Sequence, residues 1–190
     1  MRLPIPRVRA IPPEEWSGEA KDALGPVSGG GGAFPALNIF RTLANYPKLA
    51  KRWMVFANHV LGKNTLPPRE REILILRIGW LCSAEYEWAQ HVVIGKREGL
   101  TDDEIRAIGV GPDAPGWSEL DRALLRATDE LHGDAFIGDA TWGVLAKHLN
   151  QQQLFDVVFT VGNYNLVSMA LNTLGVQLDS GLTGFPPGKK

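Results

Sequence analysis

The run ILILRIGWL, residues 73–81, restricts the possible folds of this chain more than any other stretch. Arg77 is its one charged residue, so a helix formed by this run is apolar on nearly every side. Such a helix must be buried by elements that surround it. Prolines stand just before it in TLPPRERE, where the first turn of a helix accepts them. We therefore expect a central buried helix that begins near Thr65 or Leu66.

Helical patterns recur along the rest of the chain, and no convincing alternating strand interrupts them. Residues 101–104, TDDE, form a capping box, and Asp139 is expected to cap a later helix. We predict an all-α fold of one domain spanning residues 1–190, with a flexible glycine-rich loop at 25–35 and a non-helical tail at 179–190. The expected helices cover residues 12–25, 36–62 with a break at 45–47, 84–98, 101–108, 118–132, 138–149 and 150–178.

Composition excludes several classes of protein. The 190 residues suffice for one sizeable core, and 44% hydrophobic with 22% charged residues is ordinary for a globular chain. A net charge of -1 with scattered basic residues argues against a nucleic-acid partner. No apolar run reaches the ~20 residues of a membrane span, and the N-terminus lacks the apolar core of a secretory signal. We expect a cytoplasmic protein with no membrane partner.

Cys82 is the one cysteine of the chain, so an intrachain disulfide and a Cys-x-x-Cys redox pair are both excluded. It lies where one predicted helix gives way to the next. A thiol at a helix N-terminus is stabilised as the thiolate, which would make Cys82 reactive. The alternative is a small buried hydrophobic residue, which is the commoner role of a free cysteine.

A candidate acid/base group follows Cys82. Glu87 and His91 are four residues apart and share one helix face, where the carboxylate would raise the pKa of the imidazole and orient it. Glu72 stands in the apolar central helix, where an unpaired carboxylate is costly. Its candidate partners are His91, Arg77, Tyr86 and water. The alternatives are a surface pair for Glu87 and His91 and a structural ion pair with an arginine for Glu72.

Other polar and aromatic residues carry weaker signals. A metal site built from Glu72, Glu87 and His91 lacks the spacings of known helical metal sites, so we expect no metal. The remaining histidines are His59, His132 and His148, which have no convincing sequence partners and are interpreted as structural or solvated. Trp88 adjoins the acid/base group and is a candidate substrate-binding residue.

Residues 67–105 resemble the carboxymuconolactone decarboxylase family, which includes the alkylhydroperoxidase D-like proteins. The matching motifs are R-x-R-E-x-x-I-L-R, Y-E-W-x-x-H and G-L-T-x-x-E-I. The flanks Asn38–Trp53 and Asn163–Asp179 are similar to a long-chain branch of the same family. The resemblance implies an alkylhydroperoxidase D-like bundle of six to eight helices, assembled as a homo-oligomer (dimer, trimer or hexamer).

The hydroperoxidase members of that family carry Glu-x11-Cys-x-x-Cys-x3-His. When this pattern is aligned on His91, the two cysteines fall on Ala84 and Glu87, and the relay glutamate falls on Glu72. The glutamate and the histidine match, but both thiols are missing. A sulfenic acid on the isolated Cys82 would need an external thiol to recover.

The resemblance to the decarboxylase branch therefore implies a cofactor-free lyase or isomerase acting on a small carbonyl or lactone acid. His91 would move a proton, and Glu87 or Glu72 would orient it. Tyr86 and Tyr164 are candidate donors to an enolate, and Arg77 is a candidate for binding a substrate carboxylate. The alternatives are an antioxidant alkylhydroperoxidase of peroxiredoxin type that uses Cys82, and a non-catalytic helical oligomer that binds a small ligand.

Overall fold

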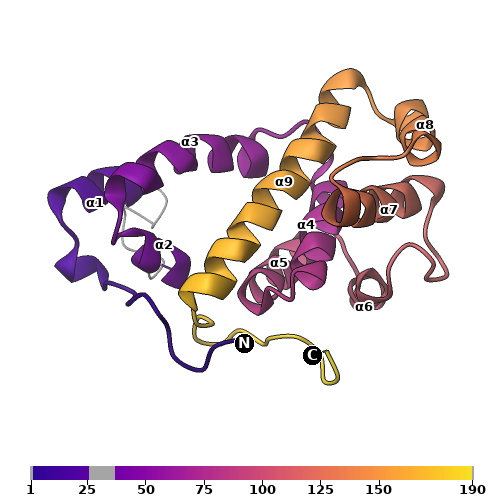
Figure 1. The fold of residues 1–190 in the computed structure, drawn as a ribbon. Coiled ribbons are helices and arrows are strands. Elements are labelled where there is room, and N and C mark those ends of the chain that lie inside the picture. The colour runs from indigo at the N-terminus through magenta and orange to yellow at the C-terminus, as the bar shows by residue number, and fades with distance from the viewer. Residues whose placement is uncertain (1, 26–36, 190) are drawn as a thin grey trace.

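The computed structural model describes residues 2–25 and 37–189, and within these ranges it is all-helical, with no strand (Figure 1). This confirms the predicted fold class, but the described residues form nine α-helices instead of six to eight. The predicted helix at 12–25 is divided because Ser17 caps a new helix, its side chain accepting a bond from the Ala20 N–H. The elements are η1 Pro13–Glu15, α1 Gly18–Leu24, α2 Asn38–Leu43, α3 Pro47–Gly62, α4 Pro68–Leu81, α5 Glu85–Arg97, α6 Asp102–Val110, α7 Glu119–Asp134, α8 Asp139–His148 and α9 Gln151–Leu174.

Helix α4 is the buried centre that its sequence predicts. Every residue from Arg71 to Gly79 is buried, and the helix packs against α5, α6, α7 and α9. Prolines occupy its cap and first position, so it begins two residues later than expected. The main hydrophobic core is assembled around this helix.

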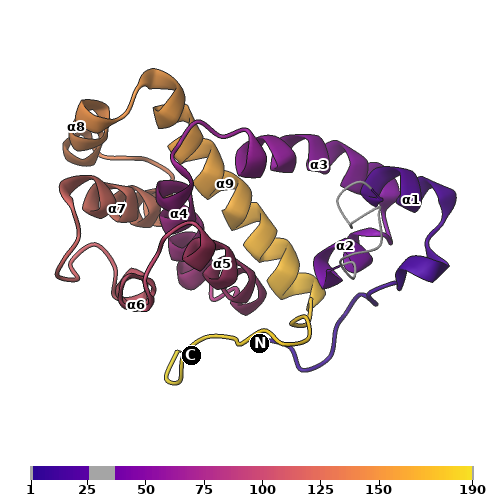
Figure 2. The ribbon, with the colours of Figure 1, turned by 180° about the vertical axis from the view of Figure 1, so that it is seen from behind.

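Helix α9 runs between two parts of the molecule, with α1, α2 and α3 on one side and α4 to α8 on the other (Figures 1 and 2). Contrary to our expectation, it is long and apolar enough to suit a membrane span, with a hydropathy of 1.3. However, 44% of that apolar window is buried inside the protein, and core helices meet the same test, so a single such helix is weak evidence of a membrane span.

The termini and caps differ in detail from the sequence patterns. Thr101 and Glu104 form the predicted capping box, whereas Gly138, and not Asp139, is the cap of α8. Gly25 ends α1, and the rest of the predicted loop at 25–35 lies outside the described residues. The tail has no helix, as predicted. It folds back onto the rest of the chain, where Phe185 packs against Trp80.

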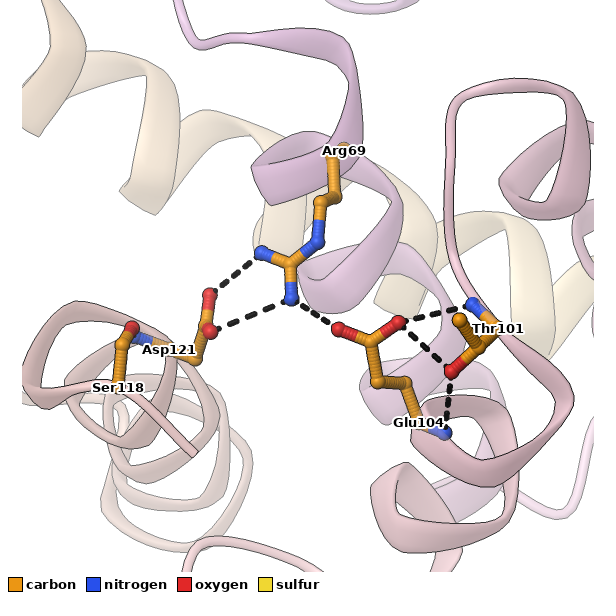
Figure 3. Close-up of polar contacts among 5 residues, drawn as sticks. All are labelled: Arg69, Thr101, Glu104, Ser118 and Asp121. Atoms are coloured by element: carbon orange, nitrogen blue, oxygen red, sulfur yellow. Dashed lines mark hydrogen bonds and ion pairs between the residues drawn. The ribbon is translucent and has the colours of Figure 1, made fainter. Parts of the chain in front are cut away.

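An arginine cluster ties α4 to α6 and α7 (Figure 3). Arg69 donates to both carboxylate oxygens of Asp121, at 2.8 and 3.2 Å, and to Glu104 at 2.5 Å. The same two carboxylate residues belong to helix starts, since Glu104 accepts from the Thr101 N–H and the Asp121 N–H donates to Ser118. Arg69 therefore joins the N-termini of two helices to the central one.

Candidate active site

His91 is held between two carboxylates in the interior of the molecule. Its Nδ1 lies 2.6 Å from Oε2 of Glu72, and its Nε2 lies 3.0 Å from Oε1 of Glu87. Glu87 precedes His91 by one turn of α5, whereas Glu72 comes from α4. All three are buried, and Glu72 is 0% exposed. The structure thus joins the three groups that sequence reasoning considered together, and it pairs Glu72 with His91.

Glycines let α4 and α5 approach at this cluster. A Cβ atom on Gly79 would stand 3.5 Å from Cγ of Glu87, and one on Gly95 would stand 3.0 Å from Leu100 and 3.7 Å from Cβ of Glu72. A methyl group at Gly79 would make ordinary van der Waals contact, whereas one at Gly95 would force the Leu100 side chain to shift. The close packing of the two helices sets the distance from Glu72 to the imidazole ring.

The cluster favours a charged imidazole. Burial alone lowers the pKa of His91, but the charges of Glu72 and Glu87 and the hydrogen bonds to both outweigh burial and raise it to about 10. Arg71 adds a second positive charge, with its Nε 3.3 Å from Oε1 of Glu72. At neutral pH two carboxylates are therefore balanced by an imidazolium and a guanidinium.

A cavity of about 300 Å3 lies against this cluster, between α2, α3, α5 and α9. Glu87 and His91 form part of its wall, and Glu72 lies behind His91. Its volume is at the lower end of the range of ligand pockets, which suits a small molecule. The wall is mostly apolar and consists of Leu37, Ile39, Phe40, Trp53, Met54, Ala57, Asn58, Leu61, Tyr86, Glu87, Gln90, His91, Ile94, Asn163, Tyr164 and Val167.

Tyr164 brings an available donor to the cavity. Its ring meets the His91 ring edge to face, with centroids 5.0 Å apart. The side chain is 6% exposed, and its hydroxyl has no hydrogen-bond partner among the described residues. Burial, followed by the charges of Glu87 and Glu72, raises the pKa of Tyr164 well above its ordinary value. The hydroxyl therefore keeps its proton at neutral pH and can donate a hydrogen bond to a ligand.

Tyr86 also lines the cavity, but its hydroxyl already donates a hydrogen bond within the protein. Its hydroxyl donates to Oδ2 of Asp179 at 2.6 Å and accepts from Gln90 at 3.2 Å and from the Ile39 N–H at 3.3 Å. A phenol has one proton to donate. The expectation that Tyr86 donates to an enolate is therefore corrected, and this side chain fixes the cavity wall instead.

Two predicted substrate-binding residues are not among the described residues that line the cavity. Arg77 donates to both oxygens of Asp129, at 2.6 and 2.9 Å, and to the Ile108 carbonyl, so it neither pairs with Glu72 nor reaches the cavity. Trp88 is buried against Trp80, with ring centroids 5.0 Å apart. Because Trp88 follows Glu87 by one residue, the helix turns its ring away from the face that carries His91.

Cys82 also lies apart from the cavity wall. It is the C-cap of α4 and not the start of α5, so the expected N-terminal stabilisation of a thiolate is wrong. Its thiol donates to Oδ1 of Asn165 at 3.0 Å and lies 3.9 Å from Nδ1 of His132. Burial raises the pKa of the Cys82 thiol, although Ser168 and Arg2 lower it. The half-buried thiol is thus predominantly protonated.

Several polar residues of the site were missed in the sequence. Arg71 directly precedes Glu72, and a charge inside an apolar helix was the available signal. Asn163 accepts from the Trp53 indole at 3.2 Å, and Asp179 reaches the site only because the tail folds back. Among the described residues no cluster of three His, Cys, Asp or Glu side chains has the geometry of a metal site.

Comparisons with known proteins agree with this architecture. Residues 47–130 match the model of the carboxymuconolactone decarboxylase family. No curated protein matches the chain. Among solved structures, an alkylhydroperoxidase AhpD core from Ralstonia eutropha, an uncharacterized peroxidase-related protein, is similar with a TM-score of 0.79 and 18% identity over 94% of each chain.

Two further structures share the fold. A peroxidase-related protein from Silicibacter sp. is similar with a TM-score of 0.73 and 15% identity, over 94% of this chain and 92% of its own. A cysteine-to-alanine variant of the debrominase Bmp8, in complex with 2,3,4-tribromopyrrole, has a TM-score of 0.70 and 15% identity over 90% of this chain and 91% of its own. At these identities the likeness establishes the fold alone.

Proposed function

Since its residues 47–130 belong to the carboxymuconolactone decarboxylase family, we propose that this chain is an enzyme that performs acid/base chemistry on a small carbonyl or lactone acid. The observation that carries the proposal is the imidazole of His91, held by two carboxylates at the wall of a small apolar cavity. The reaction is a decarboxylation, another C–C cleavage or an isomerisation.

In the decarboxylation, the C–C bond to the substrate carboxylate breaks and CO2 leaves. The electron pair stays behind as an enolate, whose oxygen accepts a hydrogen bond from the unpartnered Tyr164 hydroxyl. The imidazolium of His91 gives its Nε2 proton to the carbon, and solvent restores that proton. Glu72 holds Nδ1 throughout and acts as a positioning residue.

In the isomerisation, the Glu87 carboxylate takes a proton from the carbon next to the carbonyl group. Glu87 is suited to this step because it lines the cavity, whereas Glu72 lies behind the imidazole. The proton returns to a different carbon of the same enolate, so no proton is gained or lost. The apolar wall excludes water and strengthens these interactions.

The proposal is tested by deuterium exchange. Small keto acids and lactone acids are incubated with the protein in D2O, and proton NMR follows loss of the α-proton while CO2 release is measured. We expect turnover in the wild type and in Cys82→Ser, and turnover lowered by about 10²–10⁴-fold in His91→Gln. Turnover in His91→Gln near the wild-type level would contradict this assignment. If the wild type shows no turnover either, the protein would be a pure binding module.

The alternative is a thiol-dependent antioxidant role, which the peroxidase-related neighbours favour. Two features weigh against it: Cys82 is not among the described residues at the cavity, and burial raises its pKa. Consumption of an organic hydroperoxide with a thiol reductant, compared between wild type and Cys82→Ser, separates the two. Robust consumption lost with the sulfur would overturn the acid/base proposal.

We also propose that the protein forms a homo-oligomer. Large apolar side chains are exposed along α9 and on the adjacent α3, and such surfaces commonly mark protein contacts. Light scattering should give a mass that is a multiple of 20.8 kDa, and a monomer at every concentration would contradict the proposal. The exposed side chains include Val55, Phe56, Phe155, Phe159, Leu166 and Met169.

A further inference from the structure

A second cavity, of about 200 Å3, lies beside the first between α2, α3 and α9. Three residues, Ile39, Trp53 and Val167, line both cavities, so the two spaces lie on either side of the same side chains. Trp53 is fixed in this wall by the hydrogen bond from its indole to Asn163. The second cavity therefore adjoins the cavity of His91 and Glu87 across these shared side chains.

The second cavity offers a ligand nothing but apolar contact. Thr42 is the one polar side chain among its described lining residues, and its hydroxyl already donates to the Asn38 carbonyl at 2.8 Å. Ordered water needs two to four polar partners, which this wall does not supply. The remaining lining residues are Leu43, Leu49, Leu166, Ala170, Leu171, Leu174 and Val176.

The two cavities divide polar from apolar contacts. The titratable and amide side chains all line the first cavity, and they are Asn58, Tyr86, Glu87, Gln90, His91, Asn163 and Tyr164. A substrate that uses both spaces must therefore have one polar end and one apolar end. We propose that the second cavity is a subsite for an apolar tail of the substrate, which passes the Trp53 ring while its carbonyl end stays at His91 and Tyr164.

This subsite rests on the proposed function for the position of the carbonyl end, and it restricts the substrate class to carbonyl compounds with an extended alkyl or aryl group. Burial of each added methylene contributes free energy until the second cavity is full. Affinity should thus rise with the chain length of the ligand. The first cavity alone could support this rise only for chains short enough to fit its small volume.

The test measures binding of straight-chain 2-alkanones of increasing length to the full chain, by calorimetry and by tryptophan fluorescence. We expect the affinity to rise about fourfold per methylene and then to level off. Ala170→Phe and Ala170→Leu, which narrow the second cavity alone, should abolish the rise and leave the shortest ketones unaffected. Thr173→Phe changes an exposed residue of α9 that lines neither cavity and is the matched control.

Two results overturn the subsite. One is an affinity that does not depend on chain length, including binding that is undetectable at every length. The other is a length dependence that Ala170→Phe leaves intact. A change of mass in light scattering for Ala170→Phe, without any length dependence, would mean that a second copy of the chain covers this cavity. Because binding is measured without turnover, failure of the acid/base chemistry would leave this test readable.

Discussion

Two clusters that each include a residue of α4 share an arrangement of charge but differ in burial. In each, one basic side chain lies between two carboxylates: Arg69 between Asp121 and Glu104, and His91 between Glu72 and Glu87. Arg69 and Glu72 are one turn apart on α4. The arginine cluster is partly open to solvent, with side chains 27% and 29% exposed for Arg69 and Glu104, whereas the His91 and Glu72 side chains are 7% and 0% exposed.

The basic groups differ in whether they titrate. Hydrogen bonding to Asp121 raises the pKa of Arg69 further above an already high value, so it stays charged and holds three helices together. An imidazole can lose its proton, and that of His91 lies at a cavity wall. The comparison teaches that two carboxylates around a base mark a functional site only where the base can exchange its proton with a bound molecule.

The largest expected effect comes from removing the basic group of the His91 cluster. His91→Gln should lower turnover of the substrate found by deuterium exchange by about 10²–10⁴-fold, because a positioned proton donor is lost. Arg69→Gln is the matched control and should leave turnover within a few-fold of the wild type. Equal losses in the two variants would show that both clusters act through stability alone.

The next effect concerns the buried carboxylate. Glu72→Gln should lower the free energy of unfolding by about 3–5 kcal/mol, because it leaves buried charges without their partner. Asp121→Asn removes a carboxylate from the arginine cluster and should cost about 1–3 kcal/mol, the value of a hydrogen bond to a charged group. Urea denaturation measures both, and a greater loss for Asp121→Asn would reverse the assignment.

The two clusters should also lose their stabilisation at opposite ends of the pH scale. The raised pKa of His91 means that its contribution is fully present below pH 6.5 and is lost as pH rises through about 10. Burial alone would raise the pKa of Glu104, but bonds from Thr101 and Arg69 lower it, so its contribution is present above 4.5 and is lost as pH falls.

The measurement is urea denaturation from pH 2 to 10, so that the scan covers the range below pH 4.5 as well as the range up to about 10. The destabilisation caused by His91→Gln should shrink as pH rises from 6.5 to about 10, with a limiting slope of about 1.4 kcal/mol per pH unit. The destabilisation caused by Glu104→Gln should shrink toward acid pH instead. Parallel profiles for the two variants are the result that contradicts this prediction.

The smallest effect comes from salt. Arg69→Met should lower the free energy of unfolding by about 1–3 kcal/mol at low ionic strength, because it breaks the same ion pair as Asp121→Asn. Near 1 M salt, where the Debye length is about 3 Å, this difference should fall toward zero because the cluster is partly exposed. The cost of Glu72→Gln should hardly change with salt. Equal salt sensitivity in the two variants would remove the distinction by burial.

Part of the site was predictable because it depends on neighbouring residues. The spacing of Glu87 and His91 on one helix sets their contact, and the apolar run around Glu72 required a partner for that carboxylate. The choice among His91, Arg77 and Tyr86 was not predictable, since it depends on how α4 and α5 pack. Trp88 was misplaced because a one-residue step turns a side chain by about 100° around the helix, and Arg77 because five residues after Glu72 lie on another face of α4.

The sequence by itself determined most of the helices, the capping box of Thr101 and Glu104, the buried character of α4 and the absence of a cysteine pair, because these depend on residue types and local spacing. Only the tertiary structure decided which groups meet. The fold brings Glu72 to His91, directs the Arg77 guanidinium to Asp129, separates Cys82 from the cavity and carries Asp179 to Tyr86. Those contacts join residues far apart in the chain, and helix packing, which spacing does not encode, sets their distances.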